Sequence, residues 1–509
     1  MVKVTFRDHN GGARPASGPG AFPLGAAITL ADLDHDPHPW LARLRDTEPV
    51  SWLPALHGWL VTRHDLAVAV MRDSAAFTVD DPRFSTARVV GPSMLSLDGA
   101  AHGRHRAPFT KGFGRAEIHA RLAAFVVAEA DRLVSAMRPD GVADLRRGLA
   151  GPLSVAVVAE ALGLGDADPA TVLGWYAAIV GSVSALTGEH GRFPGGEDAR
   201  EDQARRDQAR RDQARMAGAE AFGSLSARLT AVIGSASERP SLLAAAAGAR
   251  EDGTAGGDRA GAGTAEGTGG AEAESTGGAG AVSPALTTAE VISNAAVIMF
   301  GGIETTEGMI SNVVLHLLQH PGQLALVRED PDLVPGAVEE SLRLEPAAAV
   351  VDRYATRDVT IGGARIRAGD LVTVSLAGAG RDPAMYPHPD TFDVRRPNAR
   401  LNLAFAHGPH FCLGAHLARL EAQAAVRAAL TLPGLRLDPA HPAAPPWAGV
   451  PQTAVAARPV GRLTAGPGQL GRWLSRAGAG RGGSAGTPHR RGPGPGACRR
   501  HPCRRHVPR

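Results

Sequence analysis

One cysteine stands out because of the residues around it. The chain of 509 residues contains three cysteines, and Cys412 lies in the stretch FAHGPHFCLG, from Phe405 to Gly414. A helical pattern, LGAHLARLEAQAAVRAAL, starts directly after it, which places the thiol at a helix N-terminus, where backbone N–H groups and the helix dipole favour a thiolate. Gly408 and Gly414 allow a tight loop with N–H groups aimed at the sulfur, as in metal-bound thiolates. Taken alone, a free cysteine is more often a buried structural thiol.

A second group of residues could move protons. Glu304 and Thr305 follow Gly301 and Gly302 at the centre of a long apolar helical pattern. Glycines cost helix stability and a buried carboxylate costs desolvation, so both penalties at one place indicate a functional site. The alternative is a buried carboxylate that is satisfied by the neighbouring hydroxyl.

Two charged pairs have ordinary explanations when each is taken by itself. Glu340 and Arg343 are three residues apart on a short helix that Pro335 opens, and they share one face. His102 and Arg106 are four residues apart, as on a basic helical face.

The elements that carry these residues are mostly helices. Thr287 and Glu290 form a capping-box pattern, and the apolar run after them continues to Pro321. This run predicts a helix of roughly 45–50 Å at 1.5 Å per residue, and because it is apolar nearly all round, we expect it to be buried. Alternation between glycine-containing turns predicts strands in residues 358–378.

Together and in this order, the motifs resemble those of the cytochrome P450 family of haem-thiolate monooxygenases. FAHGPHFCLG is similar to the cysteine loop of that family, ESLR to its Glu-x-x-Arg helix, GGIETT to its oxygen-binding helix and HGRHR to its propionate-binding helix. Four spaced motifs rarely arise by chance. The resemblance runs from about Leu30 to about Leu463. It implies a mainly α fold with small β-sheets (α+β), with haem b between the long central helix and the cysteine-loop helix.

The resemblance also implies a role for each site residue. Cys412 is implied as the axial ligand of the haem iron, whose electron donation favours O–O cleavage, with Phe405 shielding its sulfur. Glu304 and Thr305 match the acid–alcohol pair that relays protons to O₂, and the residues implied to leave room for O₂ are Gly301 and Gly302. The residues implied to pair with the haem propionates are His102, Arg106, Arg353 and His410. The residues implied to lock the proximal side are Glu340, Arg343 and Arg396.

Three positions depart from the family pattern. Ala406 stands where the cysteine loop usually has glycine, which is a mild change if φ there stays below zero. Gly301 replaces the common alanine and loosens the helix further. Thr391 lacks the arginine of many relatives, so Arg396 is assigned to the network on weaker grounds than Glu340 and Arg343.

Composition divides the chain into parts. We expect a flexible lead at 1–25 and a cytochrome P450 domain at 26–463, interrupted by a charged, solvated helical repeat at 198–216 and a disordered low-complexity insert at 251–283. The net charge is +3, and the last 46 residues contain ten arginines and no acid, so the first 463 residues carry −7. The basic tail at 464–509 is expected to be disordered and without specific nucleic-acid binding. No signal peptide or membrane span is predicted, which favours a cytoplasmic protein.

The expected function is insertion of one oxygen atom of O₂ into an apolar organic substrate, by hydroxylation or epoxidation, in secondary metabolism. The resemblance implies a pocket lined by residues 78–97, 175–193, 347–351 and 447–455, and the small apolar residues of 347–351 favour a terpenoid or polyketide. The chain has no flavin or nicotinamide fingerprint, so electrons are expected from a ferredoxin and its NAD(P)H-dependent reductase, docking near Arg104, Lys111 and Arg115. The alternatives are a haem-binding sensor and a non-catalytic recruitment partner.

Overall fold

The computed structural model describes residues 21–138, 143–187, 199–235, 241–248 and 285–437, with side chains in the helix at 199–234 described from residue 208. The predicted insert at 251–283, the tail at 464–509 and the pocket segment 447–455 lie outside the described residues.

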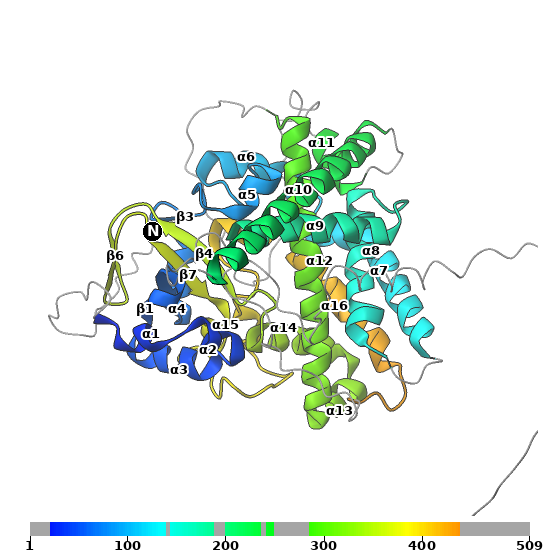
Figure 1. Ribbon diagram of the computed structural model, residues 1–509. Coiled ribbons are helices and arrows are strands. Elements are labelled where there is room, and N and C mark those ends of the chain that lie inside the picture. Colours follow the sequence, from blue (N-terminus) through cyan, green and yellow to red (C-terminus); the bar gives the residue numbers. More distant parts are fainter. Residues whose placement is uncertain (1–20, 139–142, 188–198, 236–240, 249–284, 438–509) are drawn as a thin grey trace, which may run out of the picture. The chain divides into compact units, whose positions relative to one another are not determined.

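The described chain is mostly helical with two small sheets, as predicted (Figure 1). In its first part the helices are α1 (Pro23–Ala27), α2 (Leu30–His35), α3 (His38–Thr47), α4 (His64–Arg72), α5 (Ser85–Val90), α6 (Gly99–Thr110), α7 (Arg115–Met137), α8 (Gly151–Leu162) and α9 (Pro169–Thr187). They are followed by α10 (Ala199–Gly234), α11 (Leu242–Gly248), α12 (Thr288–Gln319), α13 (Pro321–Glu329), α14 (Val334–Leu344), α15 (Leu376–Gly380) and α16 (Ala415–Leu430). Short turns of other helix types include η4 (Arg146–Ala150) and η8 (Gly408–His410).

The strands form a five-stranded mixed sheet and a separate hairpin. The larger sheet has the order β1-β2-β7-β4-β3, with β2 and β7 parallel and the other neighbours antiparallel. Its strands are β1 (Val50–Leu53), β2 (Gly58–Val61), β3 (Phe77–Thr78), β4 (Val350–Ala355) and β7 (Leu371–Ser375). The hairpin joins β5 (Val359–Ile361) to β6 (Ala364–Ile366) through Gly362 and Gly363, both at positive φ. The strands predicted in 358–378 are therefore confirmed.

The packed chain begins earlier than predicted. Phe22 is buried and its ring meets the Trp59 ring edge-on, with centroids 5.1 Å apart. Gly25 is buried in α1. A Cβ there would lie 2.1 Å from the Ser51 hydroxyl oxygen, so the close packing at this position requires glycine. Residues 22–25 thus belong to the packed domain rather than to the flexible lead.

The long central helix agrees with its prediction. The Thr287 side chain accepts a hydrogen bond from the N–H of Glu290, and the Glu290 side chain accepts one from the N–H of Thr287, so the capping box is complete. α12 is buried along most of its length and contacts α8, α14 and α16. It crosses the helical part of the domain (Figure 1).

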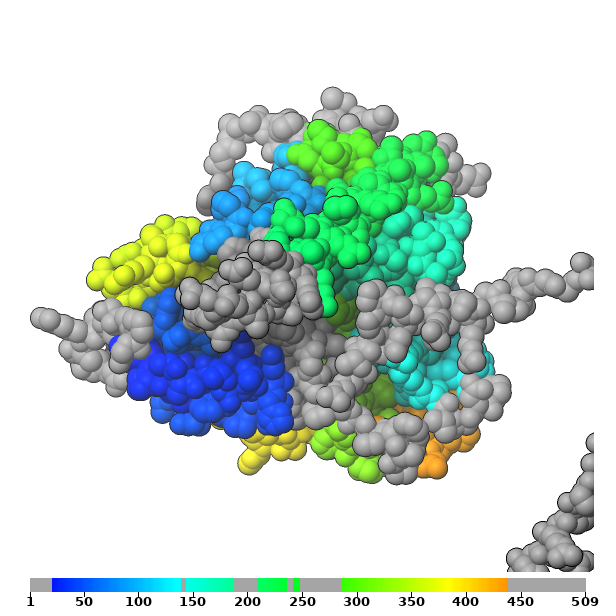
Figure 2. Space-filling model, viewed as in Figure 1, coloured from blue at the N-terminus to red at the C-terminus, as the bar shows by residue number. Residues whose placement is uncertain are grey.

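The charged repeat lies in a helix at the surface. α10 includes it, and most of the described side chains from 208 to 217 are exposed. Figure 2 shows α10 on the front face of the helical part. Among the described residues, one helix contains a stretch long and apolar enough to cross a bilayer, Pro169–Leu186 in α9. In the structure α9 packs against α8 and α10.

The two adjacent glycines of α12 have different surroundings. A Cβ on Gly302 would lie 2.8 Å from Cγ2 of Val158 in α8, whereas a Cβ on Gly301 would meet no heavy atom within 4 Å. The missing side chain of Gly302 is therefore required for close packing of α8 on α12, in addition to the expected role of both glycines in leaving room for O₂. At Gly301 the space around the missing side chain is open.

Substitution of these glycines separates the two roles. Gly302→Ala should destabilise the protein by about 1–3 kcal/mol through overpacking, whereas Gly301→Ala should stabilise it by up to about 1 kcal/mol through helix propensity. Denaturant unfolding of both variants beside the natural protein measures the difference. Equal effects at the two positions would contradict the packing role of Gly302.

Candidate active site

A deep cavity lies between α12 and the loop that carries Cys412. The empty volume of the cavity is about 1730 Å³, part of which is open to solvent. Gly301, Glu304 and Thr305 of α12 line it, and so do Phe405 and Cys412 of the loop. The rest of the wall is mainly apolar and includes Val79, Phe84, Met94, Leu95, Val297, Phe300, Ala347, Ala348 and Val351.

Two of the predicted pocket segments contribute to this wall, and the described part of a third segment does not. Residues from 78–97 and 347–351 line the cavity. In the described part of 175–193, no residue lines it. α9 instead contacts the site through Tyr176, whose hydroxyl donates a hydrogen bond to Glu304 of α12.

The thiol of Cys412 faces the cavity. The residue is exposed because its side chain lines this space. The Cys412 N–H donates to the Phe405 carbonyl oxygen at 2.9 Å, which closes the loop just before Gly414, the N-cap of α16. Although Cys412 is open to the cavity, the surrounding protein keeps its thiol away from bulk water and so raises its pKa, while the Gly414 N–H and the cations of Arg106 and Arg419 act in the opposite direction and favour the thiolate.

The loop contains one strained residue. Ala406 has φ of +59°, so the condition under which its replacement of glycine would be mild is not met. A left-handed conformation costs a non-glycine residue about 1–2 kcal/mol. Gly408 has φ of +75°, and a Cβ there would lie 2.6 Å from the Met71 carbonyl oxygen, so this position requires glycine. Gly414, at φ of −82°, has an ordinary conformation.

Arg419 supports the loop from α16, and the sequence motifs did not reveal it. Its guanidinium carbon lies 4.4 Å from the centroid of the Phe405 ring. The same guanidinium donates to Glu339 of α14 through Nε at 2.5 Å and Nη2 at 3.1 Å. Phe405 is therefore held between the cavity and a fixed cation, a cation–π arrangement that restrains the ring beside Cys412.

Three of the four residues expected to bind propionates line the cavity, and the fourth, His102, packs against one of them. The three are Arg106, Arg353 and His410. Arg106 Nη2 donates to the Phe411 carbonyl oxygen at 2.7 Å, and the His102 and His410 ring centroids are 4.4 Å apart. Burial lowers the pKa of Arg106 and that of Arg353. Burial, together with the neighbouring charges of His410 and Arg106, lowers the pKa of His102 to about 4.

Asp98 joins this cluster and was not predicted. Its Oδ1 lies 2.7 Å from His410 Nε2, and its Oδ2 accepts hydrogen bonds from the Thr78 hydroxyl at 2.6 Å and the Val79 N–H at 2.8 Å. Burial raises the pKa of Asp98, but these hydrogen bonds outweigh that effect and hold it well below its usual range. Asp98 occupies Nε2 of His410, so only Nδ1 of that ring remains for another group. Its place four residues before His102 was the only sequence signal.

Glu304 and Thr305 project from the centre of α12 toward different partners. The Thr305 hydroxyl donates to the Gly301 carbonyl oxygen. Glu304 Oε2 accepts a hydrogen bond of 2.6 Å from the Tyr176 hydroxyl of α9. Burial raises the pKa of Glu304, more than the hydrogen bond from Tyr176 lowers it. Both residues line the cavity, so an acid and an alcohol stand side by side at its wall.

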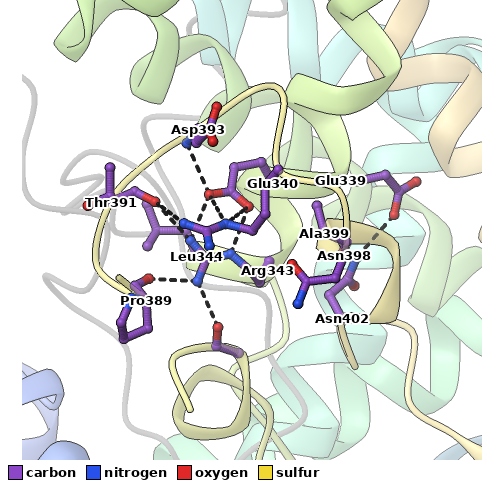
Figure 3. A network of polar contacts seen from close by, with 12 residues as sticks. Glu339, Glu340, Arg343, Leu344, Pro389, Thr391, Asp393, Asn398, Ala399 and Asn402 are labelled. Atoms are coloured by element: carbon purple, nitrogen blue, oxygen red, sulfur yellow. Dashed lines mark hydrogen bonds and ion pairs between the residues drawn. The ribbon is translucent and has the colours of Figure 1, made fainter. Parts of the chain in front are cut away.

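A buried carboxylate holds the predicted structural network together (Figure 3). Glu340 pairs with Arg343 through two hydrogen bonds of 2.7 Å and with Arg396 Nε at 2.9 and 3.0 Å, and both Glu340 and Arg343 side chains are 0% exposed. Arg343 also donates to the carbonyl oxygens of Gly380, Pro389 and Thr391. The structure thus brings Arg396 into the network and uses the backbone of Thr391, whatever its side chain.

Arg104 does not lie free for a redox partner, contrary to the expectation. It forms an ion pair with Glu290 at the start of α12 and contacts His105. Glu290 in turn closes the capping box of α12, so the positive charge of Arg104 is used inside the domain. Lys111 and Arg115 are exposed.

Comparison with known proteins agrees with this geometry. The family model "Cytochrome P450" matches residues 279–439. Cytochrome P450 monooxygenase PikC of Streptomyces venezuelae is 35% identical over 419 residues, which is 80% of this chain and 86% of PikC. Nocardicin C N-oxygenase of Nocardia uniformis subsp. tsuyamanensis is 31% identical over 442 residues, 84% of this chain and 94% of that protein. The crystal structure of CalO2 has a TM-score of 0.67 and 27% identity, with 84% of this chain and 95% of that chain covered.

The chain therefore belongs to the cytochrome P450 family. As a member of it, the protein is an oxidoreductase of the monooxygenase type that uses haem and O₂.

The residues around the cavity fit a haem. A cysteine thiol with thiolate-favouring neighbours faces in from one side. At one end, buried cations border the cavity, and Nε2 of buried His102 has no hydrogen-bond partner among the described residues. Such a set of donors suits carboxylates that enter from outside the chain. Cys412 would hold the iron, and Arg106, Arg353 and His102 would hold the propionates.

The Glu340 network should be essential for a stable fold. Glu340→Gln leaves two buried arginines without their carboxylate, which should cost about 3–5 kcal/mol of unfolding free energy. Glu129→Gln is a matched control, because Glu129 pairs with Arg132 at the same i, i+3 spacing in α7, where the Arg132 side chain is 63% exposed. That change should cost less than about 1 kcal/mol. Denaturant unfolding compares them, and similar losses would refute the importance of burial.

Proposed function

We propose that this protein binds haem b through Cys412 and inserts one oxygen atom of O₂ into an apolar organic substrate in secondary metabolism. The observation that carries the proposal is that Cys412 and the Glu304–Thr305 pair line one cavity. Each turnover takes the substrate, O₂, two electrons and two protons, and releases the oxygenated product and one water molecule. Bound haem supplies the iron at which O₂ is activated, and a thiolate ligand favours cleavage of its O–O bond.

The polar residues of α12 supply protons and hold them in place. The Thr305 hydroxyl donates to the Gly301 carbonyl oxygen, so its oxygen can accept a hydrogen bond from a neighbouring proton donor. Glu304 is adjacent, and because burial raises its pKa, it holds a proton at a higher pH than an ordinary carboxyl does. An acid with a pKa near the working pH is an effective proton donor.

The apolar wall selects the substrate. Phe84, Met94, Phe300, Ala347 and Val351 present hydrocarbon surface to the cavity, and burial of apolar area is the main attraction such a wall offers. We propose a terpenoid or polyketide as the substrate class. Limonene, testosterone and dodecanoic acid form a suitable apolar panel, with citrate as a small charged control, and the spin-state shift of the haem reports binding.

Two variants test the proposal together. The reduced natural protein with carbon monoxide should give a strongly red-shifted Soret band, and Cys412→His should lose it. With a panel compound that binds, Thr305→Ala should keep the band but divert electrons from product into hydrogen peroxide, because proton delivery is impaired. The readouts are the difference spectrum and the product and peroxide formed per NADH.

The outcome also separates the alternatives. A haem-binding sensor would show the band and be indifferent to Thr305→Ala. A non-catalytic recruitment partner would lack the band in a correctly folded sample. Either result would overturn the oxygenase proposal.

We propose a ferredoxin as the electron donor, itself reduced by an NAD(P)H-dependent reductase. Five basic residues are exposed on elements that adjoin the cysteine loop and α16: Arg72, Lys111, Arg115, His119 and His416. The pKa of His416 is lowered by burial and then by the charges of Arg419, Arg115 and His119, so the positive charge of this surface comes mainly from Arg72, Lys111 and Arg115. Such a surface attracts an acidic partner to the face nearest Cys412.

Charge reversal tests this docking surface. Arg115→Glu should raise the KM for the ferredoxin severalfold and leave kcat at saturating ferredoxin unchanged, because rim charges act mainly on association. Arg210→Glu on α10 is the control, since Arg210 is exposed on an element that does not adjoin the loop. Higher salt should reduce the difference between natural protein and Arg115→Glu. An equal effect of both variants would argue against the surface.

A further inference from the structure

Glu307 is a second buried acid on α12 that the proposed chemistry has not used. It forms an ion pair with Arg146 of η4, and a Cβ on Gly151 at the start of α8 would lie 3.6 Å from its Cδ. Its side chain is 18% exposed and that of Arg146 is 14% exposed. Among the residues described, Glu307 is not part of the cavity wall. The exposed part of the Glu307 side chain therefore does not open into the cavity.

Glu304 lies between Glu307 and the cavity. The two acids are three residues apart on one helix, so their Cβ atoms are about 5–6 Å apart and their carboxyls share a face. Tyr176 occupies Oε2 of Glu304 at 2.6 Å, and Oε1 has no hydrogen-bond partner within the described chain. One oxygen of Glu304 is thus anchored and the other is available to exchange a proton.

Burial and the neighbouring acids favour proton uptake, while the charge of Arg146 opposes it at both Glu304 and Glu307. Burial raises the pKa of Glu307, and Arg146 opposes this while Asp144 adds to it. The charge of Glu307 also raises the pKa of Glu304, after the larger effect of burial. Asp144 lies at the surface with its side chain 55% exposed. The groups that face the two acids are therefore Tyr176, Arg146 and Asp144.

We infer that Glu307 is the outer station of the proton path that ends at Thr305, and that Tyr176 is the residue that positions Glu304 within it. This inference rests on the proposed oxygenase function. A proton passes from the Glu307 carboxyl to Oε1 of Glu304, directly or through one water molecule, and from Glu304 toward the Thr305 hydroxyl. Glu307 then regains a proton from solvent water beside Asp144. No bond other than O–H bonds is made or broken, and no electron moves.

Glu307→Gln in the haem-loaded enzyme tests the path. With the panel compound that gives the largest spin-state shift, product per electron pair should fall roughly tenfold, peroxide should rise, and the solvent deuterium isotope effect on product formation should increase. Glu307→Asp keeps a titratable group and should restore much of the loss. Tyr176→Phe should also lower product per electron pair, while leaving the carbon monoxide band unchanged.

Arg146→Gln is the matched control for a purely structural role. It breaks the same ion pair but leaves the Glu307 carboxyl in place. If the pair serves only stability, Glu307→Gln and Arg146→Gln should lower the unfolding temperature equally and change the product formed per electron pair equally. That result would overturn the inference. If Glu307 carries protons, Glu307→Gln should change the isotope effect far more than Arg146→Gln, which shifts the pKa of Glu307 but keeps its carboxyl.

An infrared readout is independent of turnover. Because burial raises the pKa values of Glu304 and Glu307, the band of a protonated carboxylic acid should persist to higher pH than for ordinary carboxyls and lose intensity in Glu307→Gln. An unchanged band would overturn the inference. If the natural protein makes product and Thr305→Ala is uncoupled while Glu307→Gln behaves normally, the path fails and the oxygenase function stands. If the natural protein has no thiolate band, the function itself fails.

Discussion

The buried carboxylate of Glu340 is the constraint on which the segment from α15 to the cysteine loop depends. A charge with no exposed surface must be fully paired, since removing one partner of such a pair leaves an uncompensated charge in a low-dielectric interior. Arg343 and Arg396 supply that pairing, and they also bind carbonyl oxygens of Gly380, Pro389 and Thr391. The chain between α15 and the cysteine loop is irregular apart from one short 3-10 turn, Ala399–Leu401, and these side chains hold it to α14. Cys412 is presented to the cavity at the end of that chain.

The cavity divides its tasks between surfaces of different polarity. Apolar side chains from the α5 region, α12 and the segment before β4 form the substrate wall, while cations gather at one end, near α6 and β4. Glu304 of α12 lines another part of the wall and accepts a hydrogen bond from Tyr176 of α9. Glu307 lies outside the wall and pairs with Arg146 of η4, so the two acids of α12 have different partners. Each surface comes from several elements, and the fold brings them together.

The sequence was sufficient wherever the interaction is local. The capping box of Thr287 and Glu290 and the turn at Gly362–Gly363 depend on residues a few positions apart, and all were predicted correctly. Partners from distant segments were missed: Tyr176 is 128 residues from Glu304, Arg146 is 161 residues from Glu307 and Asp98 is 312 residues from His410. None of these partners lies within a quoted motif, and apart from the nearness of Asp98 to His102, nothing in their own neighbourhood distinguishes them from ordinary helix or cap residues.

Backbone conformation and competition for partners set the other limits. Ala406 adopts a positive φ because the loop between Leu403 and Cys412 must turn back on itself, with the Ala406 N–H bound to Leu403 and the Cys412 N–H bound to Phe405, and no local pattern announces that demand. Arg104 looked like a free surface cation until the fold placed Glu290 beside it. Strands β1 to β4 were not anticipated. β1 and β2 form a local hairpin, whereas the pairings of β2 with β7 and of β3 with β4 join segments that are far apart in the sequence.

The cluster of His102, Arg106 and Arg353 has a consequence for how the chain matures. Burial works against the positive charge of each of these groups, so the folded chain is electrostatically frustrated at this end of the cavity. An anionic cofactor relieves that frustration, and any ligand that binds only the folded state adds RT ln(1 + [L]/Kd) to its stability. Folding and cofactor supply are therefore thermodynamically linked. The amount of native protein that a cell accumulates should follow its haem supply as well as its rate of translation.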